Sequence, residues 1–232
     1  MIKLRSFQVA LFSNMISFDS KIDYASKIIA ASGGIFDGEP AILPIPNNAP
    51  PEIPRIVVKS KDEKYVCNTS INRIDLFFNP RKDTEEDLSN IKKDYLSLLL
   101  KIINFLNETY KFKVFRIGIV ANMILELKES ANTFITSKYL KEASLISNTF
   151  EAQLNFLNKI ELLKRYKANR WLRIMTVRNK EEIENDKFLA VTIDINTLQD
   201  VSHDFDRELV SLIFNDTIRD MQELLDSHYK GL

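Results

Sequence analysis

Basic and aromatic side chains are interleaved in one short stretch of the chain, residues 159–180. Lysine and arginine neutralise phosphates, while tyrosine and tryptophan rings stack on exposed bases, so the pattern is typical of a nucleic-acid contact. The same pattern also fits a site for an acidic protein partner. A third interpretation is a solvated hairpin whose positive charge is balanced by the neighbouring acidic loop 181–186, and we favour this one. The residues that could make such a contact are Lys164, Arg165, Tyr166, Lys167, Arg170, Trp171, Arg173 and Arg178.

Other side chains with catalytic or metal-binding chemistry lack a suitable setting. Segment 203–208 combines a histidine with acids, but its spacing matches no ligand pattern, and acids at a helix start complement the helix dipole. Cys67 has no neighbouring base and is expected to be a buried structural thiol. Asp75, Glu161 and Asp194 are single acids on the polar faces of expected strands. We therefore predict no catalytic residue, no metal site and no cofactor, and expect the chain not to be an enzyme.

Composition predicts an ordinary globular protein of the cytoplasm. The chain has 232 residues, of which 45% are hydrophobic and 28% charged, and its formal net charge is zero. A balanced charge gives no global attraction to nucleic acid or to an anionic membrane. The single cysteine allows no intrachain disulfide. We expect no membrane partner, because no apolar run reaches the length of a span and the N-terminal residues lack the apolar core of a signal peptide.

The elements expected along the chain repeat one order twice: a strand, a helix, several strands and a long helix. Periods of two and of 3.6 residues distinguish the strands from the helices. In the first half we expect strands at 4–12, 55–60, 64–68 and 71–78, and helices at 20–31 and 83–110. In the second half we expect strands at 113–127, 152–163, 170–177 and 188–195, and helices at 134–146 and 204–228. The proline-rich segment 40–54 is expected to be an extended surface connector.

This order predicts an α+β fold of two pseudo-repeated β-α-β(3–4)-α units, 1–111 and 112–232, fused into one domain. Short polar turns favour a mainly antiparallel sheet, and the long amphipathic helices are expected to cover one of its faces. The order resembles the topology of the TATA-binding-protein fold. That likeness concerns topology alone, so no functional residue of the family is carried over. A helix-grip fold with a ligand cavity is the alternative.

Function is less well defined by the sequence than architecture. We expect a non-catalytic protein-binding module whose partner is another protein or a second copy of the chain. The first alternative is a nucleic-acid-binding protein that uses the predicted hairpin 159–180. The second is an enzyme whose site is assembled from residues far apart in the sequence.

Overall fold

The structure of the protein is a computed structural model. It describes residues 2–229 except 15, 17, 47, 82, 83, 85, 141–150, 178–186 and 201. In the part of the chain that the structure describes, no helix has the length and apolar character that crossing a membrane requires.

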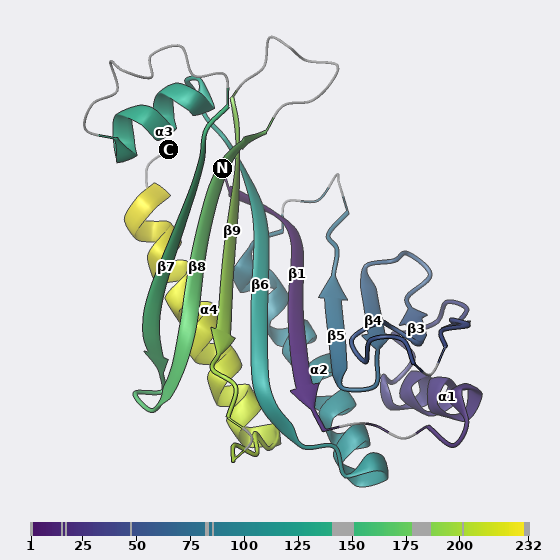
Figure 1. The fold of residues 1–232 in the computed structure, drawn as a ribbon. Helices are drawn as coiled ribbons and strands as arrows, with labels where there is room; N and C mark the ends of the chain where they lie inside the picture. The colour runs from purple at the N-terminus through teal and green to yellow at the C-terminus, as the bar shows by residue number, and fades with distance from the viewer. Residues whose placement is uncertain are drawn as a thin grey trace.

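Nine strands of the described residues form one antiparallel sheet in the order β2-β3-β4-β5-β1-β6-β9-β8-β7 (Figure 1). The central pair, β1 and β6, separates the other strands of the first half of the chain from those of the second half. The strands are β1 (Ile2–Ser13), β2 (Ala41–Ile42), β3 (Ile56–Lys59), β4 (Tyr65–Thr69), β5 (Arg73–Phe78), β6 (Val114–Glu126), β7 (Gln153–Leu162), β8 (Tyr166–Val177) and β9 (Phe188–Thr197).

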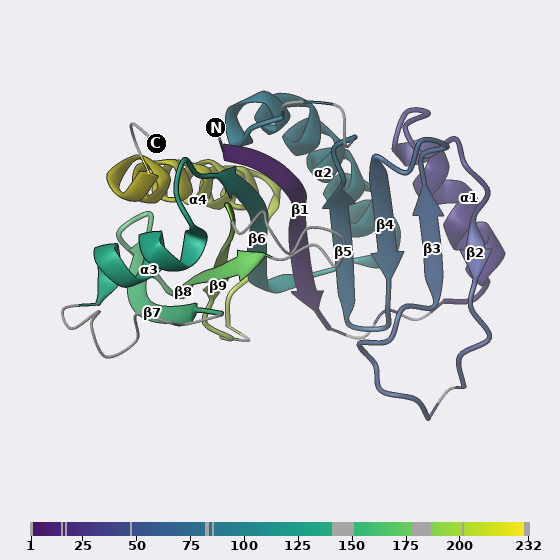
Figure 2. The same ribbon diagram turned by 90° about the horizontal axis from the view of Figure 1, so that it is seen from above.

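Two long helices lie side by side against one face of this sheet, which is the rear face in Figure 1 and the upper face in Figure 2. The four described helices are α1 (Lys21–Ala31), α2 (Leu88–Tyr110), α3 (Ala131–Tyr139) and α4 (Arg207–Tyr229). The opposite face, here called the open face, carries no helix of the described residues (Figure 2). The expected mixed α+β fold with a large antiparallel sheet is confirmed, whereas the TATA-binding-protein topology is not.

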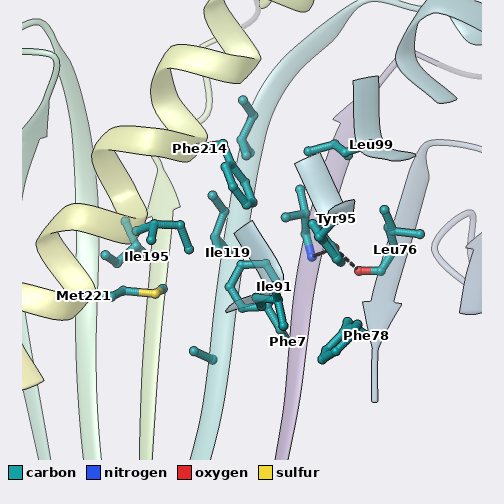
Figure 3. Close-up of a cluster of buried hydrophobic side chains, with 14 of the residues drawn as sticks. Phe7, Leu76, Phe78, Ile91, Tyr95, Leu99, Ile119, Ile195, Phe214 and Met221 are labelled. Carbon is teal, nitrogen blue, oxygen red and sulfur yellow. Dashed lines mark hydrogen bonds between the residues drawn. The ribbon is translucent and has the colours of Figure 1, made fainter. Parts of the chain in front are cut away.

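The core fills the space between the sheet and the helices (Figure 3). Alternate residues of β1 point into it, because successive side chains of a strand face opposite sides. Phe7 is fully buried and lies edge-on to Tyr95 of α2 and Phe214 of α4, at 5.0 and 6.0 Å between ring centroids. Tyr95 and Phe214 stack on each other at 5.9 Å. One aromatic cluster therefore joins both long helices to the central strand.

Several element boundaries differ from those expected. Helix α2 begins at Leu88, not at 83, because the Asp87 side chain accepts hydrogen bonds from the first free backbone N–H groups. Helix α3 ends at Tyr139, and the remaining part of its expected range, 141–146, lies outside the described residues. Strand β8 begins at Tyr166 and not at 170, so the β7–β8 turn is shorter than predicted.

Candidate nucleic-acid interface

The β7–β8 hairpin divides the predicted contact residues between two faces. Side chains alternate along β8, so residues with odd numbers point to the open face and those with even numbers point to the helices. Lys167, Trp171 and Arg173 lie on the open face, whereas Tyr166 and Arg170 lie on the helix face. A ligand on the open face could therefore contact Lys167, Trp171 and Arg173 but not Tyr166 or Arg170.

Arg170 holds the hairpin against helix α4. Its Nη1 donates to both carboxylate oxygens of Asp220, at 2.8 and 3.0 Å. Both side chains are mostly buried, with exposed fractions of 21% and 27%. Tyr166 is also structural, because its buried ring packs edge-on against Phe205 at 5.3 Å. Both side chains therefore stabilise the hairpin from behind.

The turn of the hairpin holds Lys164 and Arg165, both exposed. Leu163 and Lys164 have φ values of 52° and 55°, the left-handed region that both central residues of a type I′ turn adopt. The backbone N–H of Leu163 donates to Asp216 of α4 at 2.7 Å, which helps to hold this strained backbone. Arg178, the last predicted contact residue, lies outside the described residues.

Trp171 and Arg173 form a stacked pair on the open face. The Arg173 guanidinium lies 5.4 Å from the centre of the Trp171 ring, and its Nη2 lies 3.4 Å from Asp194 on β9. The side-chain amide of Asn196 donates to the same carboxylate. Gly118 makes room for this amide, because a Cβ at that position would lie 2.5 Å from Asn196 Oδ1. A cation and an indole ring are thereby held together on a surface without a covering helix.

A second cluster of this kind lies across the central strands, centred on Phe12. Arg73 and Arg116 place their guanidinium carbons 5.0 and 4.7 Å from the centre of the Phe12 ring. Arg73 donates from Nε and Nη2 to Asp75, at 2.8 and 2.6 Å, and Gln8 donates to the same oxygen at 2.7 Å. The side chain of Arg116 has no hydrogen bond or ion pair with any other described residue.

Sequence reasoning missed the Phe12 cluster because its three members come from strands that are far apart in the chain. One signal was present: Phe12 shares the polar face of its strand with Gln8, and an aromatic ring there is unusual. The arginines could be found only from the strand order, which places β5 and β6 on either side of β1.

The acids that could do chemistry are already paired on this face. Asp75 and Asp194 lie on strands separated by β1 and β6, which puts them roughly 14 Å apart at ordinary strand spacing. Each one contacts an arginine, so neither is placed to share a proton with the other. Cys67 is fully buried, and this burial raises the pKa of its thiol to about 12, which makes it a poor nucleophile. Within the described ranges, no cluster of three metal-binding side chains is found.

No protein-family model matches the chain, and no curated protein matches it either. Among solved structures it is similar to a rolling circle replication initiator protein from Geobacillus stearothermophilus, with a TM-score of 0.36 and 11% identity. The match covers 99% of this chain and 86% of the other. The expectation of a non-catalytic protein-binding module is not supported, since the name of this neighbour agrees better with the nucleic-acid alternative. A TM-score of 0.36 does not establish a shared function.

Proposed function

We propose that this protein binds single-stranded nucleic acid on the open face of its sheet. The observation that carries the proposal is the stacked pair of Trp171 and Arg173 on a face with no helix over it. An aromatic ring offers a stacking platform to any base, worth about 1–3 kcal/mol per base, and a neighbouring cation neutralises a phosphate. The pair supplies both contacts at one place.

A single strand fits this surface better than a duplex does. In a duplex, each base face is covered by its neighbours, whereas the bases of a single strand can leave the stack and lie on a protein ring. The Trp171 and Phe12 rings are both half-buried, with a surface left for contact. The open face carries no helix of the described residues that could enter a groove (Figure 2).

Local charge supports the proposal although the chain is neutral overall. At the centre of the open face, three arginines accompany two aspartates. Lys159 and Lys167 of the hairpin lie on the same side of the sheet, together with one acid, Glu161, which is the direct partner of Lys167. If about four cations contact phosphates, the slope of log affinity against log salt is about −3 for a single strand. Binding should therefore be moderate and should weaken as salt is added.

We further propose that 1–111 and 112–232 are two related units of one fused domain. The order of elements supports this, because each half consists of a strand, a helix, further strands and a long helix. The sheet supports it as well, since the remaining strands of each half lie on their own side of the β1–β6 pair. The open face then receives one aromatic–arginine cluster from β5, β1 and β6, where the two halves meet, and another from β8.

Binding of a labelled single-stranded oligonucleotide, measured by fluorescence anisotropy at low and moderate salt, tests the proposed function. Arg173→Gln should weaken binding about tenfold, which corresponds to about 1.4 kcal/mol. Arg207→Gln is the matched control, because it removes the same charge from an exposed position on α4, behind the sheet. If the unmodified protein shows no binding at low salt, or if both variants lose affinity equally, the proposal is wrong.

A further inference from the structure

We propose that Phe12, Arg73 and Arg116 form a second contact for the same strand, a site that binds one backbone phosphate. This inference rests on the proposed function and adds a position to it. The three residues are here called the Phe12 site. Nothing in the residue pattern of the hairpin leads to it, because none of its members belongs to β7 or β8.

The strand register brings the three side chains into one row. Phe12 is the direct partner of Arg73 on β5 and of Arg116 on β6, so all three project from the open face side by side. Both guanidinium groups lie close to one phenyl ring. Two like charges are therefore held next to each other, and a single nearby carboxylate, Asp75, pairs with Arg73.

Arg116 is the residue that points to a ligand. A guanidinium has five N–H donors, and none of those of Arg116 donates to a described residue. Its Nε is buried without an acceptor, which is a costly state for a charged donor. The residue as a whole is partly exposed, so an acceptor from outside the protein can bind the guanidinium N–H groups that are not buried.

The chemistry of the site matches a phosphate. Arginine forks bind phosphate oxygens through pairs of parallel hydrogen bonds, and several oxygens allow two guanidinium groups to share one phosphate. Arg73 keeps Asp75 on one side, so its charge is partly neutralised, while the charge of Arg116 has no counter-ion among the described residues. Arg116 is therefore the main phosphate ligand, and Arg73 assists it.

The distance to the Trp171 platform sets the length of strand that both sites need. Trp171 on β8 lies three strands away from Phe12 on β1. Across the sheet, Trp171 pairs with Asp194, Asp194 with Val120 and Val120 with Gln8, which precedes Phe12 by four residues on β1. Strand spacing and rise per residue place the two rings roughly 20 Å apart. At about 3.4 Å per stacked nucleotide, a strand of about six nucleotides covers that distance. Shorter strands reach only one of the two sites.

The test is a series of single-stranded oligonucleotides from two nucleotides upward, titrated into the full chain. In the unmodified protein, affinity should rise until the strand is about six nucleotides long. Arg116→Gln should reduce affinity for the long strands about tenfold and leave the dinucleotide unchanged. Arg116→Lys, which keeps the charge, should lose less affinity than Arg116→Gln, and the control Arg207→Gln should keep the full length dependence of the unmodified protein. Thermal unfolding of each variant shows whether it is folded.

A second measurement needs no variant. The NMR signal of the Arg116 Nε–H group should move when a long oligonucleotide is added and stay in place with the dinucleotide. If inorganic phosphate alone moves it and strand length has no effect, the site takes a free phosphate and the inference of a backbone contact is wrong. If Arg116→Gln equals the unmodified protein at all lengths while Arg173→Gln is weaker, only this inference fails. If the unmodified protein binds no strand at all, the proposed function fails with it.

Discussion

The hydroxyl group of Tyr95 links helix α2 to β1 and β5, two of the three strands that carry the Phe12 site. It accepts a hydrogen bond from the backbone N–H of Val9 at 2.9 Å and donates to the carbonyl of Leu76 at 2.5 Å (Figure 3). Val9 and Leu76 are direct partners across β1 and β5, next to the Ala10–Asp75 pair of the open face. The hydroxyl therefore stabilises the sheet beneath the candidate interface.

Replacing Tyr95 with phenylalanine keeps the ring and removes both hydrogen bonds. The side chain is fully buried, so one backbone donor and one backbone acceptor lose this partner away from the protein surface. Each unsatisfied group costs about 1–3 kcal/mol, and partial re-pairing of the two strands recovers some of that cost. We expect the free energy of unfolding to fall by about 2–3 kcal/mol, which lowers Tm by roughly 5–10 °C for a chain of this size.

Chemical and thermal unfolding followed by circular dichroism measures the difference. Tyr110→Phe is the matched control, because the Tyr110 ring packs against Tyr24 and Phe105, while its hydroxyl has no hydrogen bond to another described residue. The control should change stability by less than about 0.5 kcal/mol. Equal stability of the two variants would refute the role assigned to the Tyr95 hydroxyl.

Three further predictions concern the hairpin turn, the end of α4 and the buried thiol. Asp216→Ala removes the acceptor for the Leu163 N–H and should cost about 2 kcal/mol in urea unfolding, whereas Asp216→Asn, which keeps an acceptor oxygen, should cost less. Burial lowers the pKa of His228, and the charge of Lys138 lowers it further, so the folded state favours the neutral ring. The unfolded chain then takes up the proton first, and stability should fall as the pH drops below about 6.5. His228→Asn should make Tm depend less on pH below about 6.5. If the variant and the unmodified protein show the same dependence of Tm on pH, His228 is not its source. Cys67 should react with a thiol reagent at mildly alkaline pH only as fast as the protein opens, since its pKa is about 12; rapid labelling of the folded protein would show that the thiol is accessible.

The sequence predicted those parts of the fold that depend on local periodicity. The inward residues of β9, such as Val191 and Ile193, follow from simple alternation, and the apolar side of α2 follows from helical spacing. The start of α2 was predicted less well, because several acids and a threonine precede it and only the structure shows that Asp87 is the cap. Strand order was not predictable in the same way, because pairing between distant segments leaves no local signal.

For the candidate site, too, features that depend on neighbouring residues were predictable from the sequence, whereas those that depend on the pairing of distant strands were not. Arg170 and Arg173 lie three residues apart in one strand, so alternation alone places them on opposite faces, and the structure shows them there. Alternation therefore divides the hairpin residues that could contact nucleic acid between the two faces of the sheet. The Phe12 site depends instead on the order β5-β1-β6, which follows from the packing of the whole sheet.

The fluorescence of Trp171 gives the most direct test of the central claim, that the open face binds single-stranded nucleic acid. Trp171 is the only tryptophan of the chain, so any change in tryptophan emission reports this one position. The account predicts that a single-stranded oligonucleotide at low salt quenches the emission until it saturates, and that added salt reverses the quenching. Unchanged emission from the folded, unmodified protein at low salt and high oligonucleotide concentration would contradict it.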